Sequence, residues 1–143
     1  MGFKEAANIS FSGMKTSLEQ VEIASSNIAN SLTTRSVEGG PYRRRTASIE
    51  EMPLSFQQVL DRATTRVSGG GVRVREISED PSPFQRVYQP GHPDAGPDGF
   101  VNLPNVRHSE EITNLLYYSR LYEANLTAYN ATKRMMQDTL QIQ

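Results

Sequence analysis

The chain has 143 residues, 36% of them apolar and 22% charged, with no cysteine or tryptophan and a formal net charge of -1. The near-zero charge gives no field that would draw the chain to nucleic acid, and the lack of cysteine excludes disulfides, thiolate metal sites and cysteine nucleophiles. No apolar run approaches the roughly 20 residues of a membrane span, so we expect neither nucleic-acid binding nor direct membrane insertion.

The first predicted element is an amphipathic helix over residues 3–31. Gly13 lies inside it and weakens it locally by about 1 kcal/mol relative to alanine. We expect the helix to end between Asn30 and Thr33. The same stretch lacks the apolar segment and cleavage site of a Sec-type signal peptide. Residues at alternating spacings of three and four, mostly apolar, form one face of this helix: Phe11, Met14, Leu18, Val21, Ser25 and Ile28.

Two asparagines near the end of this helix have two possible roles. If the amides of Asn27 and Asn30 are buried between helices, they demand specific partners and fix the register of packing. If they are exposed, they cap and fray the helix end, because asparagine side chains compete for backbone groups there. The spacing alone does not separate the two roles.

Residues 34–107 predict turns, short strands and loops. The run Gly39-Gly40-Pro41 cannot continue a helix or a central strand, so residues 36–41 form a turn. Period-two alternation and turn residues give the remaining expectations. They are a weak strand over 42–50, a short helix or an irregular segment over 54–67, a flexible break over 68–71, a strand over 72–77, a turn over 80–83, a strand over 84–88, a loop over 89–99 and an extended segment over 100–106.

A second long helix is predicted from Ser109 to about Leu140. Ser109 fits the N-cap position, and Glu110 and Glu111 fall in the first turn, where carboxylates favour the positive end of the helix dipole. Its positions at spacings of three and four are again mostly apolar: Ile112, Leu115, Ser119, Tyr122, Leu126, Tyr129, Lys133, Met136 and Leu140.

These elements predict an α+β fold, with long N- and C-terminal helices packed as a coiled-coil-like inner domain and a small β-containing domain inserted between them. We expect the first helix in residues 1–33, the middle domain in 34–107 and the last helix in 108–143. A step averaging 3.5 residues is typical of one helix packing along another. The two helical faces can pack within the chain, between chains, or both. Because so much of the apolar content lies on them, we infer that other chains complete part of the core.

Five arginines form a basic set in the predicted strand regions: Arg43, Arg44, Arg45, Arg73 and Arg75. They either contact acidic partners or an anionic cell-wall layer, or they lie on solvated strand faces. The near-zero net charge and the lack of interleaved aromatic residues favour solvated faces.

Residue types found in metal and catalytic sites occur without the spacing that such sites need. His92 and His108 lack metal-ligand spacing, and the aspartates between residues 80 and 98 lack the acid spacing of a calcium loop. No nucleophile-elbow motif is present. The pairs Glu50-Glu51 and Glu110-Glu111 are chain neighbours and therefore point to different faces. We expect no catalytic residue, no cofactor and no metal site.

Seven segments that together span nearly the whole sequence carry recognisable motifs: Ala24–Asn30 (ASSNIAN), Glu38–Arg44 (EGGPYRR), Gly71–Val74 (GVRV), Asp80–Phe84 (DPSPF), Val87–Ala95 (VYQPGHPDA), Gly99–Val106 (GFVNLPNV) and Ser119–Asn125 (SRLYEAN). In this order along the chain, they resemble the flagellar rod and hook axial protein family, and within it the proximal-rod proteins. The tyrosine-rich stretch Leu116-Tyr117-Tyr118 departs from the resemblance, since smaller residues are expected there.

The resemblance implies a structural subunit of the bacterial flagellar basal-body rod, whose terminal helices pack around the export channel and carry torque across the periplasm. It implies export by the flagellar type III apparatus without a cleaved signal. The implied partners are other rod proteins, copies of itself, the inner-membrane ring, rod-adapter proteins and the export apparatus. Another rod or hook-type axial protein is the nearest alternative. The other alternative is a cell-wall-cleaving accessory of rod assembly. It would need two converging carboxylates, and the sequence shows no such pair. The residues expected to mediate helix packing and assembly are the apolar positions of both helices, with Asn27 and Asn30.

Overall fold

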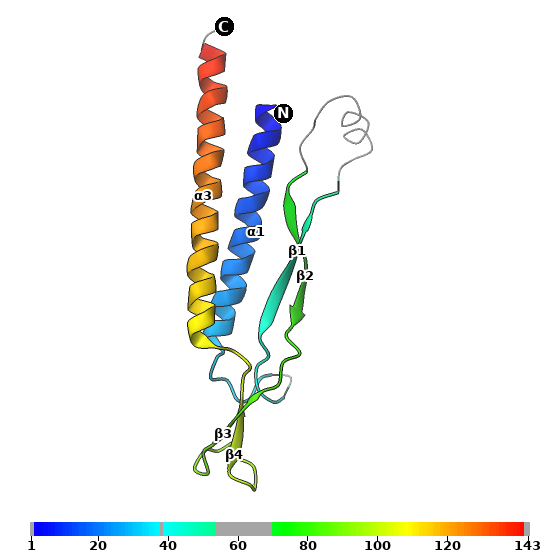
Figure 1. Ribbon diagram of the computed structural model, residues 1–143, viewed down its shortest axis with the longest axis vertical. Helices are drawn as coiled ribbons and strands as arrows, with labels where there is room; N and C mark the ends of the chain where they lie inside the picture. The colour runs from blue at the N-terminus through cyan, green and yellow to red at the C-terminus, as the bar shows by residue number, and fades with distance from the viewer. Residues whose placement is uncertain (1, 38, 54–69, 142–143) are drawn as a thin grey trace.

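The computed structural model describes residues 2–37, 39–53 and 70–141. In chain order it contains α1 (Phe3–Ala29), β1 (Arg45–Glu51), β2 (Val72–Glu79), β3 (Gln85–Tyr88), β4 (Phe100–Leu103) and α3 (His108–Gln141). The predicted fold class is confirmed, because two long terminal helices pack together and two small two-stranded sheets lie between them in sequence (Figure 1). The predictions for residues 54–67 and for the first half of 68–71 fall outside the described residues.

The two helices run antiparallel and side by side, so both termini lie at the same end of an elongated molecule (Figure 1). α3 is the longer helix and continues past the start of α1. α1 ends at Ala29 with Asn30 as its C-cap, one residue before the predicted range. The glycine expected to weaken α1 lies at the helix contact, where a Cβ on Gly13 would stand 2.7 Å from Oδ1 of Asn125. Gly13 therefore leaves room for the Asn125 amide, which a side chain at position 13 would displace.

The predicted N-cap of the last helix is wrong. α3 begins at His108, and the N–H of Glu111 already donates to the carbonyl of Arg107 at 3.0 Å. Ser109 is consequently inside the first turn, where its carbonyl accepts a hydrogen bond from the Thr113 hydroxyl at 3.0 Å. The placement of Glu110 and Glu111 in the first turn is confirmed.

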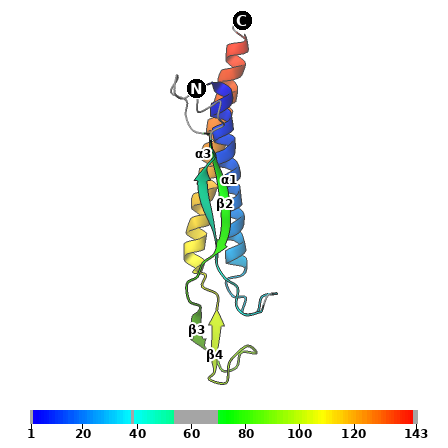
Figure 2. The same cartoon turned by 90° about the vertical axis from the view of Figure 1, so that its right-hand side faces the viewer.

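The first sheet is a two-stranded antiparallel ribbon that lies along α1 (Figures 1 and 2). β1 pairs with β2 from Arg45 opposite Glu79 to Glu51 opposite Val72, with one irregularity between Ser48 and Ile49. The first strand thus starts at Arg45, three residues later than predicted. The backbone N–H groups of Tyr42 and Arg44 are bound elsewhere, to the Thr33 carbonyl at 3.0 Å and to Asn105 Oδ1 at 2.8 Å.

The second sheet is a hairpin of β3 and β4 that extends the molecule beyond the helix pair, at the end opposite the termini (Figure 2). Tyr88 and Phe100 face each other across it with ring centroids 5.3 Å apart. Val101 of β4 is buried at 1% exposure, and Val106, in the segment between the hairpin and α3, is buried at 6%. Apolar burial therefore continues from the hairpin to the start of α3.

Candidate functional site: helix faces and the Glu111 cluster

The predicted apolar face of α1 is only partly covered. Met14 is buried and Val21 and Ile28 are half-buried, whereas Phe11 is 58% exposed and Leu18 is 48% exposed. The side of α1 that is buried carries mostly small and polar residues instead: Ser12, Thr16, Ser17, Ala24 and Asn27, together with Met14. Two of the largest apolar side chains of this helix, Phe11 and Leu18, are therefore left mostly uncovered by the contacts made within the chain.

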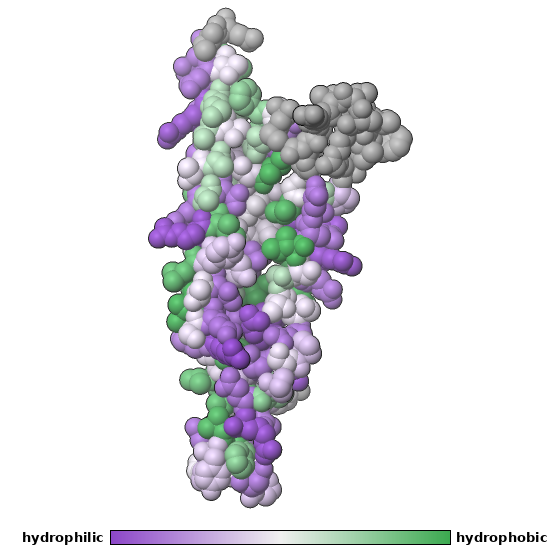
Figure 3. Space-filling model, viewed as in Figure 1, coloured by the Kyte–Doolittle hydropathy of each residue, from purple (hydrophilic) through white to green (hydrophobic). Residues whose placement is uncertain are grey.

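The predicted apolar face of α3 divides in the same way. Leu115, Tyr122 and Tyr129 are half-buried, while Ile112 is 40% exposed and Leu126 is 37% exposed. Two further members lie near the end of the helix that extends past α1 and are exposed: Met136 and Leu140. In the space-filling view, apolar side chains accordingly appear on the outer surface of the helices and the ribbon (Figure 3).

The least exposed residue of α3 is polar. Glu111, in the first turn, is 2% exposed. Its Oε1 accepts a hydrogen bond from Arg44 Nε at 2.7 Å, and its Oε2 accepts one from Asn27 Nδ2 at 3.0 Å. Its Oε1 also accepts a hydrogen bond from Asn114 Nδ2 at 3.4 Å. A buried carboxylate without partners would be strongly unfavourable, so these contacts are what allow Glu111 to be buried.

Asn27, on α1, is 1% exposed and is fully hydrogen-bonded. Its Oδ1 accepts from the N–H of Arg45 and from the Tyr42 hydroxyl, both at 2.9 Å. Its Nδ2 donates to the Arg45 carbonyl at 2.9 Å as well as to Glu111. The amide thus engages both polar backbone groups of the first residue of β1, as a neighbouring strand would. Asn30 is different, because its Nδ2 donates to the Ser26 carbonyl of its own helix at 2.9 Å.

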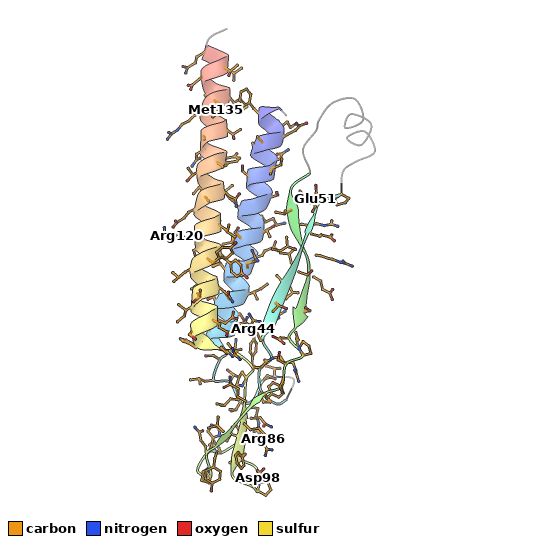
Figure 4. The ribbon with its side chains drawn as sticks, in the orientation of Figure 1. Arg44, Glu51, Arg86, Asp98, Arg120 and Met135 are labelled. Atoms are coloured by element: carbon orange, nitrogen blue, oxygen red, sulfur yellow. The ribbon has the colours of Figure 1, made fainter. Side chains whose placement is uncertain are left out.

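Arg44 joins this group to the end of β2, at the junction where the helices meet the ribbon (Figure 4). Its Nη1 donates to Asp80 Oδ2 at 3.3 Å. Burial opposes the charged guanidinium, but the hydrogen bonds and charges of Glu111 and Asp80 outweigh it, so the pKa of Arg44 is raised. We refer to Asn27, Tyr42, Arg44, Asp80 and Glu111 as the Glu111 cluster.

Asp80 is held as a carboxylate mainly by its own turn. Its Oδ1 accepts from the N–H of Ser82 at 2.9 Å and from the Ser82 hydroxyl. These two hydrogen bonds lower the pKa of Asp80 against a smaller effect of desolvation, and Arg44 adds to the lowering. The predicted turn over residues 80–83 is therefore organised by a side chain.

The basic set of arginines is divided among separate contacts. Arg73 and Arg75 are exposed on the ribbon and lie 2.7 Å and 3.8 Å from oxygens of Glu50, as predicted for a solvated strand face. That prediction is wrong for Arg44, which binds inside the Glu111 cluster. Arg43 lies over the Phe84 ring, 4.4 Å from its centroid.

The acidic residues considered as metal ligands have other partners. Asp94 accepts from the Thr34 hydroxyl at 2.7 Å and lies 3.6 Å from Arg35, and Asp98 lies 2.6 Å from Arg86. Within the described ranges, no three histidine or carboxylate side chains converge as a metal site would require. Over the same ranges, neither helix contains an apolar stretch that could cross a bilayer.

Sequence reasoning singled out Asn27 but missed its partners in the Glu111 cluster, because the members are polar and far apart in sequence. Asn27 and Glu111 are 84 positions apart, and no periodicity connects them. The available signal was the resemblance itself. Asn27, Tyr42, Arg44 and Asp80 each lie in one of the segments that carry it, although none of those segments marks a contact by its own composition.

Comparison with known proteins identifies the family. Residues 98–142 match the sequence family described as flagellar basal body rod FlgEFG protein C-terminal. The chain is 40% identical over 141 residues to the flagellar basal-body rod protein FlgC of Bacillus subtilis, covering 94% of both chains. It is 36% identical over 149 residues to FlgC of Borreliella burgdorferi, covering 99% of this chain and 98% of that one. It is 34% identical over 133 residues to FlgC of Salmonella typhimurium, covering 93% and 92%. The chain therefore belongs to the FlgC family of flagellar basal-body rod proteins, which are structural components and not enzymes.

Proposed function

We propose that this chain is a subunit of the proximal rod and polymerises through its terminal helices into the drive shaft that surrounds the export channel and transmits torque. The observation that carries the proposal is the set of large apolar side chains left exposed on both helices. Phe11 and Leu18 on α1 are 58% and 48% exposed, and Ile112 and Leu126 on α3 are 40% and 37% exposed.

The contact between the two helices supports this division of roles. Gly13 meets the Asn125 amide at this contact, and the buried residues of α1 are mostly small or polar, with Met14 the one large apolar side chain among them. Full burial of a large apolar side chain contributes roughly 1.5–3 kcal/mol, and completing a half-exposed one contributes correspondingly less. Several such positions on each helix are sufficient to hold a subunit between its neighbours.

The same features fit passage through an export channel. Helices that pack through small and polar residues gain little from pairing alone, while ordering them costs conformational entropy. We propose that the termini are marginal in the free chain, pass the type III export apparatus unfolded without a cleaved signal, and fold fully on docking in the periplasm. Near-complete hydrogen-exchange protection of both termini in dilute monomer would argue against this.

The proposed partners are other rod proteins, copies of the chain, the inner-membrane ring and rod-adapter proteins. Leu116 and Tyr117, in the stretch that departs from the family resemblance, are 62% and 59% exposed. We assign them to a contact with a neighbouring subunit. The proposal keeps the division into residues 1–33, 34–107 and 108–143, with the outer two parts forming the axial core.

The test is the substitution Leu126→Asp, produced in cells that lack their own copy of the protein. A charge on this partly exposed position should reduce the chain recovered in purified basal bodies at least tenfold and abolish swimming, because an unpaired ion would be buried between subunits. Thr127→Asp is the matched control, since it places the same charge on an exposed neighbouring position of α3. Normal incorporation of the Leu126→Asp chain would contradict the proposal.

A further inference from the structure

We propose that the Glu111 cluster is a positioning device that fixes the β1–β2 ribbon relative to α3. Among the described residues, the backbones of both strands of the ribbon run close to α1, but neither strand's backbone comes close to that of α3. Arg44 immediately precedes β1 and binds Glu111 directly. The cluster is therefore a direct side-chain link between the ribbon and the longer helix.

The Glu111 cluster holds both strands of the ribbon, because it contains the residue next to one end of each strand. Arg44 precedes β1 and Asp80 follows β2. Their backbones are joined by a hydrogen bond from the Asp80 N–H to the Arg44 carbonyl at 2.8 Å, and their side chains by the 3.3 Å contact. Glu111 therefore binds a residue that is already locked to the opposite strand.

The segment leading into α3 contributes a second attachment. Asn105 Oδ1 accepts from the N–H of Arg44 at 2.8 Å, and Asn105 Nδ2 donates to the Asp80 carbonyl at 3.0 Å. Asn105 and Glu111 thus hold the same end of the ribbon from two positions near the start of α3. With two attachments, the ribbon cannot rotate about a single bond.

At its other end, the ribbon is attached to α1 by hydroxyl groups. Ser12 Oγ accepts from the N–H of Val72 at 3.1 Å, and the Thr16 hydroxyl donates to the Val72 carbonyl at 3.4 Å. Both contacts meet a single residue of β2. When the Glu111 contact is lost, these hydroxyls and the two hydrogen bonds between Asn27 and the Arg45 backbone still hold the ribbon to α1, but its direct tie to the first turn of α3 is gone.

The carboxylate of Glu111 is specifically required. Both of its oxygens accept hydrogen bonds: Oε1 from Arg44 and, more weakly, from Asn114, and Oε2 from Asn27. A glutamine of the same shape is neutral and has one oxygen and one donor group, so it loses the ion pair with Arg44 and must also turn a donor toward either Arg44 or Asn27, losing that hydrogen bond. Glu111→Gln is therefore the smallest change that weakens the link while preserving volume.

The absence of cysteine allows spin labels to be placed at will. Labels on Glu76→Cys in β2 and Arg120→Cys in α3, both exposed positions, report the distance between ribbon and helix in the full-length chain. We expect one narrow distance distribution in the parent chain and at least a twofold broader one after Glu111→Gln, with the helical circular dichroism changed by less than a tenth. Glu110→Gln, an exposed neighbour paired with Arg107 at 2.7 Å, is the matched control and should leave the distribution narrow.

Arg44→Lys is the second variant. It keeps the positive charge, but all its donors sit on one nitrogen, whereas Arg44 reaches Glu111 through Nε and Asp80 through Nη1, so the distribution should broaden to an intermediate width. The proposal is overturned if the Glu111→Gln distribution stays narrow, or if the parent distribution is already broad. It is also overturned if Glu111→Gln removes helical signal and distance order together, because Glu111 would then be a general stability residue.

Discussion

Gly13 of α1 and Asn125 of α3 are in direct contact across the helix pair. A Cβ on Gly13 would lie 2.7, 2.8 and 2.9 Å from Oδ1, Cγ and Nδ2 of Asn125, so the whole amide group covers the glycine. The amide is held in place because Nδ2 donates to the Leu121 carbonyl at 2.9 Å. The contact explains why a residue that costs about 1 kcal/mol in a helix interior lies in the middle of α1.

Gly13→Ala is expected to lower the free energy of unfolding, even though alanine is the better helix former. The new methyl group displaces the Asn125 amide and breaks its hydrogen bond, which outweighs the gain in helix propensity. Asn125→Ala removes the obstruction, so the double variant should recover stability to the level of Asn125→Ala or above. Urea unfolding of the four chains gives the coupling energy. A value within about 0.5 kcal/mol of zero would show that the two residues act independently.

Gly71 gives a second close approach, between the ribbon and α1. It has a φ of +98°, and a Cβ there would collide with the hydroxyl of Ser12, which accepts from Val72. We expect Gly71→Ala to cost about 1–2 kcal/mol for the backbone conformation and about 1 kcal/mol more for the lost hydrogen bond. The control is Gly39→Ala. Gly39 has a similar φ of +86°, but among the described residues no atom lies within 4 Å of a Cβ added there. Equal losses in urea unfolding would mean that the Ser12 contact contributes nothing.

The helices and most of the strands could be predicted from the sequence because they depend on local patterns. Spacings of three and four placed α1 and α3 to within a few residues, and alternation placed β2. The start of β1 and the N-cap of α3 could not be predicted, because the N–H of Arg44 binds Asn105 and that of Glu111 binds Arg107. Such partners follow from the tertiary arrangement and leave no local signal.

The faces of the helices were harder to predict than their existence. A hydrophobicity pattern marks the side of α3 that carries Leu115 and Leu126, but the residues closest to α1 include Glu111 and Asn125, which such a pattern ignores. A rod subunit needs one face for its own fold and another for its neighbours. Because the internal contact includes polar residues, the apolar periodicity marks the internal contact only in part, and under the proposed function its exposed members serve the contacts between subunits.

Asn27 and Asn30 should respond very differently to the same substitution. In Asn27→Asp, a carboxylate oxygen replaces the donor that faces Glu111 and the Arg45 carbonyl, so two negative groups meet in a buried site. A buried charge without compensation costs about 3–5 kcal/mol. Asn30→Asp loses one hydrogen bond to Ser26 and places a charge at the helix C-terminus, which together cost at most about 2 kcal/mol. Denaturation midpoints and swimming assays on both variants measure the two losses. A larger loss for Asn30→Asp than for Asn27→Asp would refute the prediction.

The Glu111 cluster should also make the fold sensitive to acid through Asp80. The pKa of Asp80 is lowered in the folded chain from its ordinary value of 3.8. Its contribution to stability is therefore fully present above pH 3.8 and is lost as the pH falls through the folded value. The difference in unfolding free energy between the parent and Asp80→Asn should stay constant from pH 7 to about pH 5 and shrink in more acid solution.

Ser82→Ala tests the cause of this acid sensitivity. It removes the hydroxyl, whose hydrogen bond is the largest contribution to the lowered pKa of Asp80, while leaving Arg44 in place. With the folded pKa closer to the ordinary value, the acid-dependent loss of stability should become smaller. Urea unfolding at a series of pH values measures the loss in each chain. If Ser82→Ala kept the parent's full acid dependence, the main influence on Asp80 would be Arg44, and the turn at residues 80–83 would not be the cause.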